Sequence, residues 1–313
     1  MGPDFLCIGA VKGGTTWLHH NLRAHPGAWT PPIKEIRYFD EPRRNLRARL
    51  LERDKEGNNG DGNGDYGGYD YGYWRFQLKR FLCNGRGWLH PRRVWWHLHY
   101  FFRRRSPRWY ARLFRPAAEA QVAGEATPFY APLLEERVAF VARHFPDLKL
   151  IYLLRDPIDR TWAHVLLRCM GLPEVGWNAD RLTMDVVRRT VRERELGNDW
   201  LFRNGRYFDN LRRWERHFSP DQLFVAFHEE LKRDAAGLLH RILRFLDAPR
   251  AGEIDHALAR KRFNERPVNL TIPPAIETAF AERLIDDLRA LAERFEGPPV
   301  SEWQSRARQA CSR

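Results

Sequence analysis

Residues 9–17 read Gly9-Ala10-Val11-Lys12-Gly13-Gly14-Thr15-Thr16-Trp17, and this stretch decides the fold. The pattern predicts a buried strand before it, from Asp4 to Gly9, and a helix that starts at about Thr15 and ends at Arg23. In open α/β sheets, ligands bind where a strand ends and the next helix begins. The two glycines let the backbone approach an anion, the helix N-terminus attracts negative charge, and Lys12 adds a full positive charge. The stretch therefore predicts an anion-binding loop.

The same strand, turn and helix layout recurs further along the chain. An apolar run from Leu148 to Leu154 is followed by Arg155-Asp156-Pro157 and by a helical stretch from about Ile158 to Met170. A third strand is expected from Gln222 to Phe227, between helical segments at Tyr207–Phe218 and Ala235–Leu246. Strands that alternate with helices predict the α/β class, with a central, mostly parallel sheet flanked by helices.

The loop departs from the triphosphate-binding pattern G-x-x-x-x-G-K-[ST]. Gly9 and Gly14 match this pattern, but Thr15 occupies the lysine position and the lysine is found at position 12. An ATP-dependent P-loop kinase is an alternative function, but this chain lacks the lysine that such a kinase needs at the position of Thr15. A plain glycine turn with a solvated lysine is the structural alternative.

Two longer segments point to a family. The first runs from Lys12 through Leu18 and His25-Pro26 to Pro32-x-Lys34-Glu35-Ile36-Arg37-Tyr38-Phe39-Asp40, and the second is Ile151–Trp162 with its Arg-Asp-Pro turn. Together they resemble the 5′-phosphosulfate loop and the 3′-phosphate motif of sulfotransferases that use adenosine 3′-phosphate 5′-phosphosulfate (PAPS), above all the branch of the heparan-sulfate sulfotransferases and bacterial relatives. The resemblance implies a P-loop NTPase-like sulfotransferase fold. It implies one domain over residues 1–313, with an irregular or helical insertion at about 42–118.

The resemblance also implies how the donor is held. PAPS would bind, and adenosine 3′,5′-bisphosphate would leave, at a site made by Lys12, Gly13, Gly14, Thr15, Thr16, Trp17 and Arg155. Arginine offers a forked, charge-assisted contact to the 3′-phosphate. The family usually has a serine eight residues after this arginine, whereas this chain has Ala163, so Thr161 or backbone groups are candidates to replace that contact. Lys261, Arg262 and Asn264 are weaker candidates for the adenosine loop.

Sulfuryl transfer needs a cation for the leaving oxygen and a base for the acceptor. Lys12 is the candidate cation, and no metal ion is expected, because no β- and γ-phosphates need to be bridged. Glu35 matches the position of a glutamate that acts as general base in the resembled branch, and Arg37 could keep it ionised or contact an anionic acceptor. The alternative is a surface Glu35 that pairs with Lys34 or Arg37. The histidines at positions 19, 20, 25, 164 and 228 are interpreted as packing, capping or surface residues.

The charge of the chain favours a polyanionic partner. Lys and Arg outnumber Asp and Glu by 53 to 40, which gives a net charge of +13, so a non-catalytic binder of polyanions is a further alternative. Gly57–Gly72 is expected to be an irregular loop, and a Trp- and Arg-rich stretch follows: Trp88, Trp95, Trp96, Arg103, Arg104, Arg105, Trp109 and Arg115. This stretch could form an acceptor groove, the buried stripe of a helix, or a peripheral contact with a membrane surface.

By resemblance, a carbohydrate is the expected acceptor, with peptide, lipid and small-molecule acceptors left open and no specific nucleic-acid partner. The four cysteines form no Cys-x-x-Cys pair, which favours a reducing, cytoplasmic location. No apolar run approaches the roughly 20 residues that a membrane-spanning helix needs.

Overall fold

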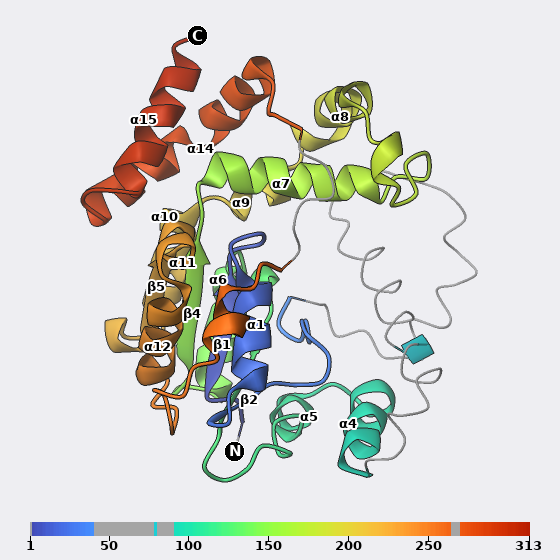
Figure 1. Ribbon diagram of the computed structural model, residues 1–313, viewed down its shortest axis with the longest axis vertical. Helices are drawn as coiled ribbons and strands as arrows, with labels where there is room; N and C mark the ends of the chain where they lie inside the picture. The colour runs from blue at the N-terminus through green and yellow to red at the C-terminus, as the bar shows by residue number, and fades with distance from the viewer. Residues whose placement is uncertain (1, 41–77, 80–90, 264–269) are drawn as a thin grey trace.

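The computed structural model describes residues 2–40, 78–79, 91–263 and 270–313. In this part of the chain, five strands form one sheet in the order β2-β3-β1-β4-β5, and every neighbouring pair is parallel. The strands are β1 (Phe5–Gly9), β2 (Ala28–Trp29), β3 (Val122–Ala126), β4 (Lys149–Leu154) and β5 (Leu223–Phe227). The predicted α/β class with a parallel central sheet is confirmed (Figure 1).

The central strands are buried on both faces. In β1, Phe5 and Cys7 belong to one hydrophobic cluster, whereas Leu6 and Ile8 belong to another. This alternation follows from the two-residue repeat of a strand, and a parallel sheet needs helices on both faces. The register pairs Phe5 with Lys149 in β4, so β1 and β4 run side by side and end at the same edge of the sheet.

Helices cover the two faces of the sheet. One cluster is completed by Leu18 of α1 (Thr15–Ala24) and Leu239 of α12 (Ala235–Phe245). The opposite cluster includes Val138 of α6 (Glu135–His144) and Trp214 of α10 (Tyr207–Glu215). The indole nitrogen of Trp214 donates to the carbonyl of Ala131 at 3.1 Å, which fastens α10 to the loop after β3.

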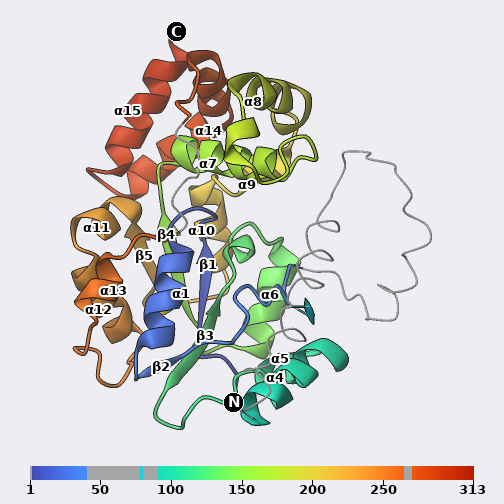
Figure 2. The same ribbon diagram turned by 45° about the vertical axis from the view of Figure 1, so that its right-hand side comes forward.

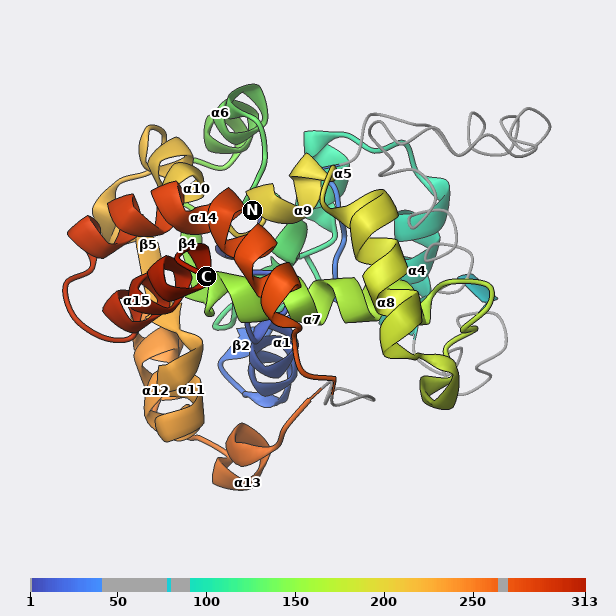
Figure 3. The same cartoon turned by 90° about the horizontal axis from the view of Figure 1, so that it is seen from above.

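A group of helices lies beyond the carboxyl ends of the strands. Figures 1 and 3 show α7 crossing this end of the molecule, with α14 and α15 beside it. The C-terminus lies at the end of α15. These helices are α7 (Pro157–Met170), α14 (Pro274–Arg294) and α15 (Val300–Cys311). Further helices are α8 (Met184–Thr190), α9 (Asp199–Arg203), α11 (His228–Arg233) and α13 (His256–Arg260). Short turns of helix occur at η3 (Pro128–Tyr130), η4 (Ala179–Arg181), η5 (Val191–Glu195) and η6 (Pro220–Gln222). Within the described residues, no helix combines the length and the apolar character that crossing a membrane requires.

The expected insertion is described only in its second half. Gly57–Gly72 and Trp88 lie outside the described residues. The helices α4 (Pro91–Phe102) and α5 (Pro107–Arg112) lie at the end of the molecule opposite α14 and α15 (Figures 1 and 2). Trp96, Tyr100 and Trp109 are buried, as a packed helix stripe predicts, whereas Trp95 is 43% exposed. Neither these rings nor Arg103, Arg104, Arg105 or Arg115 line the cavity described below, so an acceptor groove in this stretch would not be part of that cavity.

Candidate active site

The loop between β1 and α1 presses against β4. The amide of Ala10 donates to the carbonyl of Leu153 at 2.8 Å, and the amide of Gly13 donates to the carbonyl of Ala10 at 2.9 Å. A Cβ atom at Gly13 would lie 2.4 Å from the Leu153 carbonyl oxygen, so no side chain fits there. Gly14 has φ of +117° and precedes α1 without a side-chain cap. Gly14 therefore supplies no side chain that caps the amides at the start of α1.

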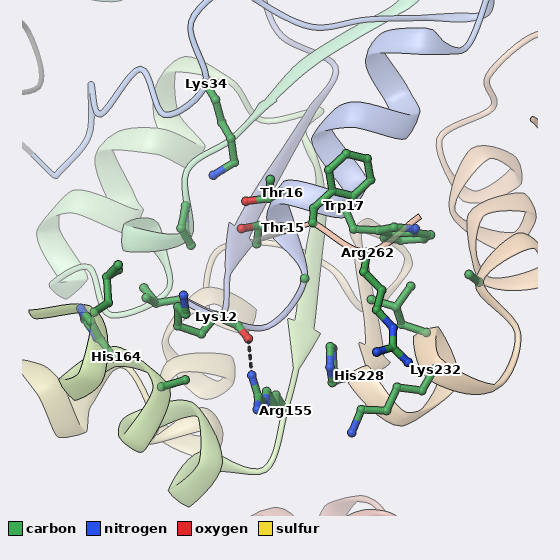
Figure 4. Close-up of a pocket in the computed structure, with 18 of the residues that line it drawn as sticks. Lys12, Thr15, Thr16, Trp17, Lys34, Arg155, His164, His228, Lys232 and Arg262 are labelled. Carbon is green, nitrogen blue, oxygen red and sulfur yellow. Dashed lines mark hydrogen bonds between the residues drawn. The ribbon is translucent and has the colours of Figure 1, made fainter. Parts of the chain in front are cut away.

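Arg155 meets this loop from the end of β4. Its Nη1 donates to the carbonyl oxygen of Lys12 at 3.3 Å, and its own carbonyl accepts from the hydroxyl of Tyr207 at 2.8 Å. Figure 4 shows this hydrogen bond, which joins the side chain of Arg155 to the main-chain carbonyl of Lys12. The two cationic residues that the sequence analysis assigned to the two ends of one nucleotide therefore lie side by side.

Residues 34–37 approach the same place from the other side. Lys34 and Glu35 form an ion pair, as the structural alternative for Glu35 expected, and both side chains are largely shielded from solvent. The Nε of Arg37 donates to Asp40 at 2.8 Å, and its guanidinium lies 4.4 Å above the ring of Phe129. Asp40 is thus a carboxylate partner of Arg37.

Backbone conformation singles out three residues of this region. Lys12, Glu35 and Arg37 have φ of 65°, 62° and 55°, in the left-handed region that glycine occupies most readily. Such a conformation costs a residue with a side chain about 1–2 kcal/mol, and it persists only where the surrounding structure holds it. Both candidate catalytic residues, Lys12 and Glu35, are held in this way.

A buried carboxylate beneath this segment provides that support. Glu125, at the end of β3, accepts the hydroxyls of Tyr110 at 2.6 Å, Tyr130 at 2.9 Å and Thr127 at 2.7 Å. It also accepts the amide of Ile36 at 2.9 Å. Burial raises the pKa of Glu125, and these hydrogen bonds oppose the rise. The sequence analysis gave Glu125 no role, although a glutamate at the end of a buried strand was an available signal.

The predicted residues line one cavity of about 2300 Å³. Lys12, Gly14, Thr15, Thr16, Trp17, Glu35 and Arg155 all contribute to its wall, while Gly13 lies behind the loop against β4. The indole nitrogen of Trp17 donates to the carbonyl of Ala259 at 2.7 Å, which ties α1 to α13. Lys261, Arg262 and Phe263, which follow α13, also line the cavity, whereas Asn264 lies outside the described residues.

Ala163 lines the cavity, but the predicted replacement at Thr161 is wrong. The Thr161 hydroxyl is buried, donates to the carbonyl of Pro157 at 2.7 Å and accepts from Arg160 at 2.8 Å. Its hydrogen bonds are directed into α7, so it does not replace a serine at position 163. Backbone groups remain the other candidates to replace the contact that the serine makes in the family.

Two histidines that sequence reasoning assigned to packing or the surface line the cavity instead. They are His164, from α7, and His228, from the start of α11 (Figure 4). Burial, and after it the charge of Arg160, lowers the pKa of His164 well below its usual value. Burial, and after it Arg155, lowers the pKa of His228 to about 4. Both rings are therefore neutral at pH 7, when they can donate and accept hydrogen bonds but carry no charge. Among the residues in the described ranges, no group of His, Cys, Asp and Glu side chains could hold a metal ion.

The fold and this site define a class: an α/β protein with a parallel sheet and a glycine-containing loop, between a strand and a helix, that lines a large cavity. Residues 3–252 match the family described as the sulfotransferase family. The chain therefore belongs to the sulfotransferase family, whose members need a sulfate donor.

Known proteins agree with this assignment. The chain is 30% identical over 146 residues to heparan sulfate glucosamine 3-O-sulfotransferase 3A1 of Mus musculus, a match that covers 45% of this chain and 35% of that protein. It is 29% identical over 158 residues to heparan sulfate glucosamine 3-O-sulfotransferase 6 of Homo sapiens, covering 49% and 43%. The chain thus spans about a third to two fifths of the length of the curated relatives that it matches.

Solved structures extend the likeness over the whole fold. A sulfotransferase from Alicyclobacillus acidocaldarius superposes with a TM-score of 0.63 at 20% identity, over 97% of this chain and 99% of that one. The sulfotransferase domain of the Synechococcus PCC 7002 olefin synthase superposes with a TM-score of 0.50 at 16% identity, over 95% and 96%. At these identities the likeness shows the fold, and it confirms the predicted sulfotransferase fold.

Proposed function

We propose that this protein transfers a sulfuryl group from PAPS to a hydroxyl or amine of a carbohydrate. The observation that carries the proposal is the meeting of Lys12 and Arg155, which share a hydrogen bond and one cavity. Lys12 would bind the 5′-phosphosulfate on the loop after β1, and Arg155 the 3′-phosphate at the end of β4. Membership of the sulfotransferase family supports this division, because the family needs a sulfate donor with anionic groups.

The reaction moves one proton and exchanges one bond at sulfur. The acceptor oxygen attacks sulfur as its proton passes to the carboxylate of Glu35, and the bond from sulfur to the bridging oxygen of the donor breaks. Negative charge then grows on that bridging oxygen, where the ammonium of Lys12 stabilises it. The ion pair with Lys34 keeps Glu35 at the cavity wall, where the acceptor enters.

The part of the cavity wall that contains Phe129 and Trp200 suits an acceptor sugar that carries acid groups. The rings of Phe129 and Trp200 are stacked 5.4 Å apart on its wall, and flat rings of this kind pack against sugar faces. Four arginines also line the cavity, at positions 37, 168, 194 and 203. The matched heparan sulfate sulfotransferases support a carbohydrate acceptor as well.

The test is a transfer assay with sulfur-labelled PAPS against glycan, peptide, lipid and phenol acceptors. We expect label on an acidic glycan and none without acceptor. Glu35→Gln should keep its affinity for adenosine 3′,5′-bisphosphate and lose roughly 10²–10⁴-fold in turnover, the usual contribution of a general base. Lys12→Ala should lose both affinity and turnover.

Glu136→Gln is the matched control, because Glu136 is an exposed carboxylate of α6 outside the cavity. It should transfer label at the wild-type rate. Normal turnover in Glu35→Gln would show that Glu35 is not the base, and label on phenols alone would exclude the carbohydrate acceptor.

A further inference from the structure

The C-terminal helix reaches the donor site from outside the region that matches the family. Helix α15 packs at the carboxyl edge of the sheet in two places (Figures 1 and 3). Trp303 lies 5.7 Å from the ring of Phe227 at the end of β5, and its indole nitrogen donates to Glu229 at 3.3 Å. One turn further on, Arg306 contacts the residues that follow Arg155. The helix therefore touches the chain just after both β4 and β5.

Two carboxylates follow Arg155 within four residues, Asp156 and Asp159, and either of them could compete with a phosphate for its guanidinium. Asp156 is buried; its Oδ1 accepts the amides of Ile158 at 2.8 Å and Asp159 at 3.1 Å, which caps α7. Its other oxygen, Oδ2, accepts from Nη1 of Arg306 at 2.8 Å. Both oxygens of Asp156 are thus engaged away from Arg155.

Asp159 lies between the two arginines. Its Oδ1 accepts from Nη1 of Arg306 at 2.9 Å, whereas its Oδ2 is 3.9 Å from Nη2 of Arg155. The first distance is a charge-assisted hydrogen bond, and the second is too long for one. Arg306 therefore holds Asp159 more closely than Arg155 does.

Arg306 is itself fixed by the helical hairpin of α14 and α15. Its Nε donates to Glu277 of α14 at 2.8 Å, and the other oxygen of Glu277 accepts from Arg313 at 3.0 Å. The hydroxyl of Thr278 donates to the carbonyl of Ala310 at 2.8 Å, which joins the two helices again. The guanidinium of Arg306 is thus oriented from its Nε side while its Nη1 faces the two aspartates.

We infer that Arg306 is a positioning residue for the donor: by holding Asp156 and Asp159, it leaves the guanidinium of Arg155 available to the 3′-phosphate. The inference rests on the proposed function, because it concerns the phosphate that distinguishes PAPS from donors without a 3′-phosphate. Without Arg306, Asp159 turns to Arg155 and forms the closer ion pair, and the phosphate must displace it.

The test measures two nucleotides that differ only in the 3′-phosphate. Calorimetry gives the dissociation constants of adenosine 3′,5′-bisphosphate and adenosine 5′-monophosphate. The dissociation constant of the monophosphate divided by that of the bisphosphate is the ratio that reports the contribution of the 3′-phosphate. Arg306→Met should lower this ratio by about tenfold, the effect of weakening one charge-assisted contact. Its affinity for the monophosphate should stay the same. Arg308→Met, an exposed arginine of the same helix, is the control and should keep the wild-type ratio.

Two further variants separate positioning from a general structural effect. Asp159→Asn in the Arg306→Met background removes the competing carboxylate and should restore the ratio, which a loosened C-terminal hairpin would not allow. In an Arg155→Met background, adding Arg306→Met should change the ratio no further, because the two residues act on one contact. Arg306→Lys keeps the positive charge but lacks the forked guanidinium, so it should lower the ratio less than Arg306→Met does. It serves as the test if Arg306→Met does not fold.

The inference is overturned if Arg306→Met, or Arg306→Lys in its place, retains the wild-type ratio, or if both affinities fall together. A wild-type protein that binds the two nucleotides equally well would refute the proposed donor, and this inference with it. If the wild type discriminates between the two nucleotides and the Arg306 variant discriminates equally well, the role of Arg306 is refuted and the proposed donor is not.

Discussion

Gly13→Ala tests whether the close contact of the loop with β4 sets donor affinity. The added Cβ would lie 2.4 Å from the Leu153 carbonyl oxygen and 3.0 Å from that of Ala10, and both neighbours are backbone atoms. An ordinary contact of at least 3.4 Å requires the loop to move by about 1 Å. The hydrogen bond from Arg155 to the Lys12 carbonyl, already 3.3 Å long, cannot survive such a movement.

Overpacking of this kind costs about 1–3 kcal/mol. If the cost falls on the donor-binding conformation, affinity for adenosine 3′,5′-bisphosphate drops by roughly tenfold to a hundredfold. Calorimetric titration measures this loss, and urea denaturation shows how much of the cost falls on stability instead.

The matched control is Gly252→Ala, since Gly252 also lines the cavity but has no atom within 4 Å of the position of an added Cβ. It should bind within about twofold of wild type, because a substitution in open space stays within about 0.5 kcal/mol. Wild-type affinity and stability in Gly13→Ala would refute the reasoning, since the loop would then tolerate a side chain that the geometry excludes.

Two further predictions concern carboxylates that are wholly or partly buried. Glu125→Gln replaces a group that accepts four hydrogen bonds and should lower the free energy of unfolding by roughly 2–4 kcal/mol; it should also lower turnover more than nucleotide affinity, because Glu125 holds the amide of Ile36. Urea denaturation and steady-state kinetics check this, and unchanged values of both contradict it. Burial raises the pKa of Asp287 from 3.8 to about 6, so the folded chain binds this proton more tightly and the free energy of unfolding falls as pH rises through that interval. Asp287→Asn should flatten this fall in urea titrations; an identical slope in the variant would mean that Asp287 does not cause it.

The elements beside the anion loop were predictable to within one or a few residues. The sequence analysis predicted a strand at Leu148–Leu154 where the structure has Lys149–Leu154, and a helix at Ile158–Met170 where it has Pro157–Met170. The apolar runs are continuous there, and Pro157 marks the turn between them. Local signals of this kind need no knowledge of the rest of the fold.

The features that sequence analysis missed depend on distant contacts. Strand β3 is only Val122–Ala126 and contains the buried Glu125, so its pattern is not that of an apolar strand. Its partners Tyr110 and Tyr130 come together only in the folded chain. The contact of Arg306 with Asp156 joins residues 150 positions apart, which no periodicity reveals.

The catalytic roles of Lys12 and Glu35 remain predictions. Lys12 and Arg155 were chosen from separate motifs, and the parallel order of β1 and β4 explains why they lie at one edge. The sequence analysis did not predict that His164 and His228 line the cavity, because a histidine after a strand or within a helix has no local pattern that marks it as part of a site.

Calorimetric titration of the wild-type protein tests the central claim, that one nucleotide with two phosphate groups spans Lys12 and Arg155. The account predicts that adenosine 3′,5′-bisphosphate binds in the presence of EDTA, and more tightly than ATP does with magnesium. Tighter binding of magnesium-ATP would contradict it and would favour a kinase instead.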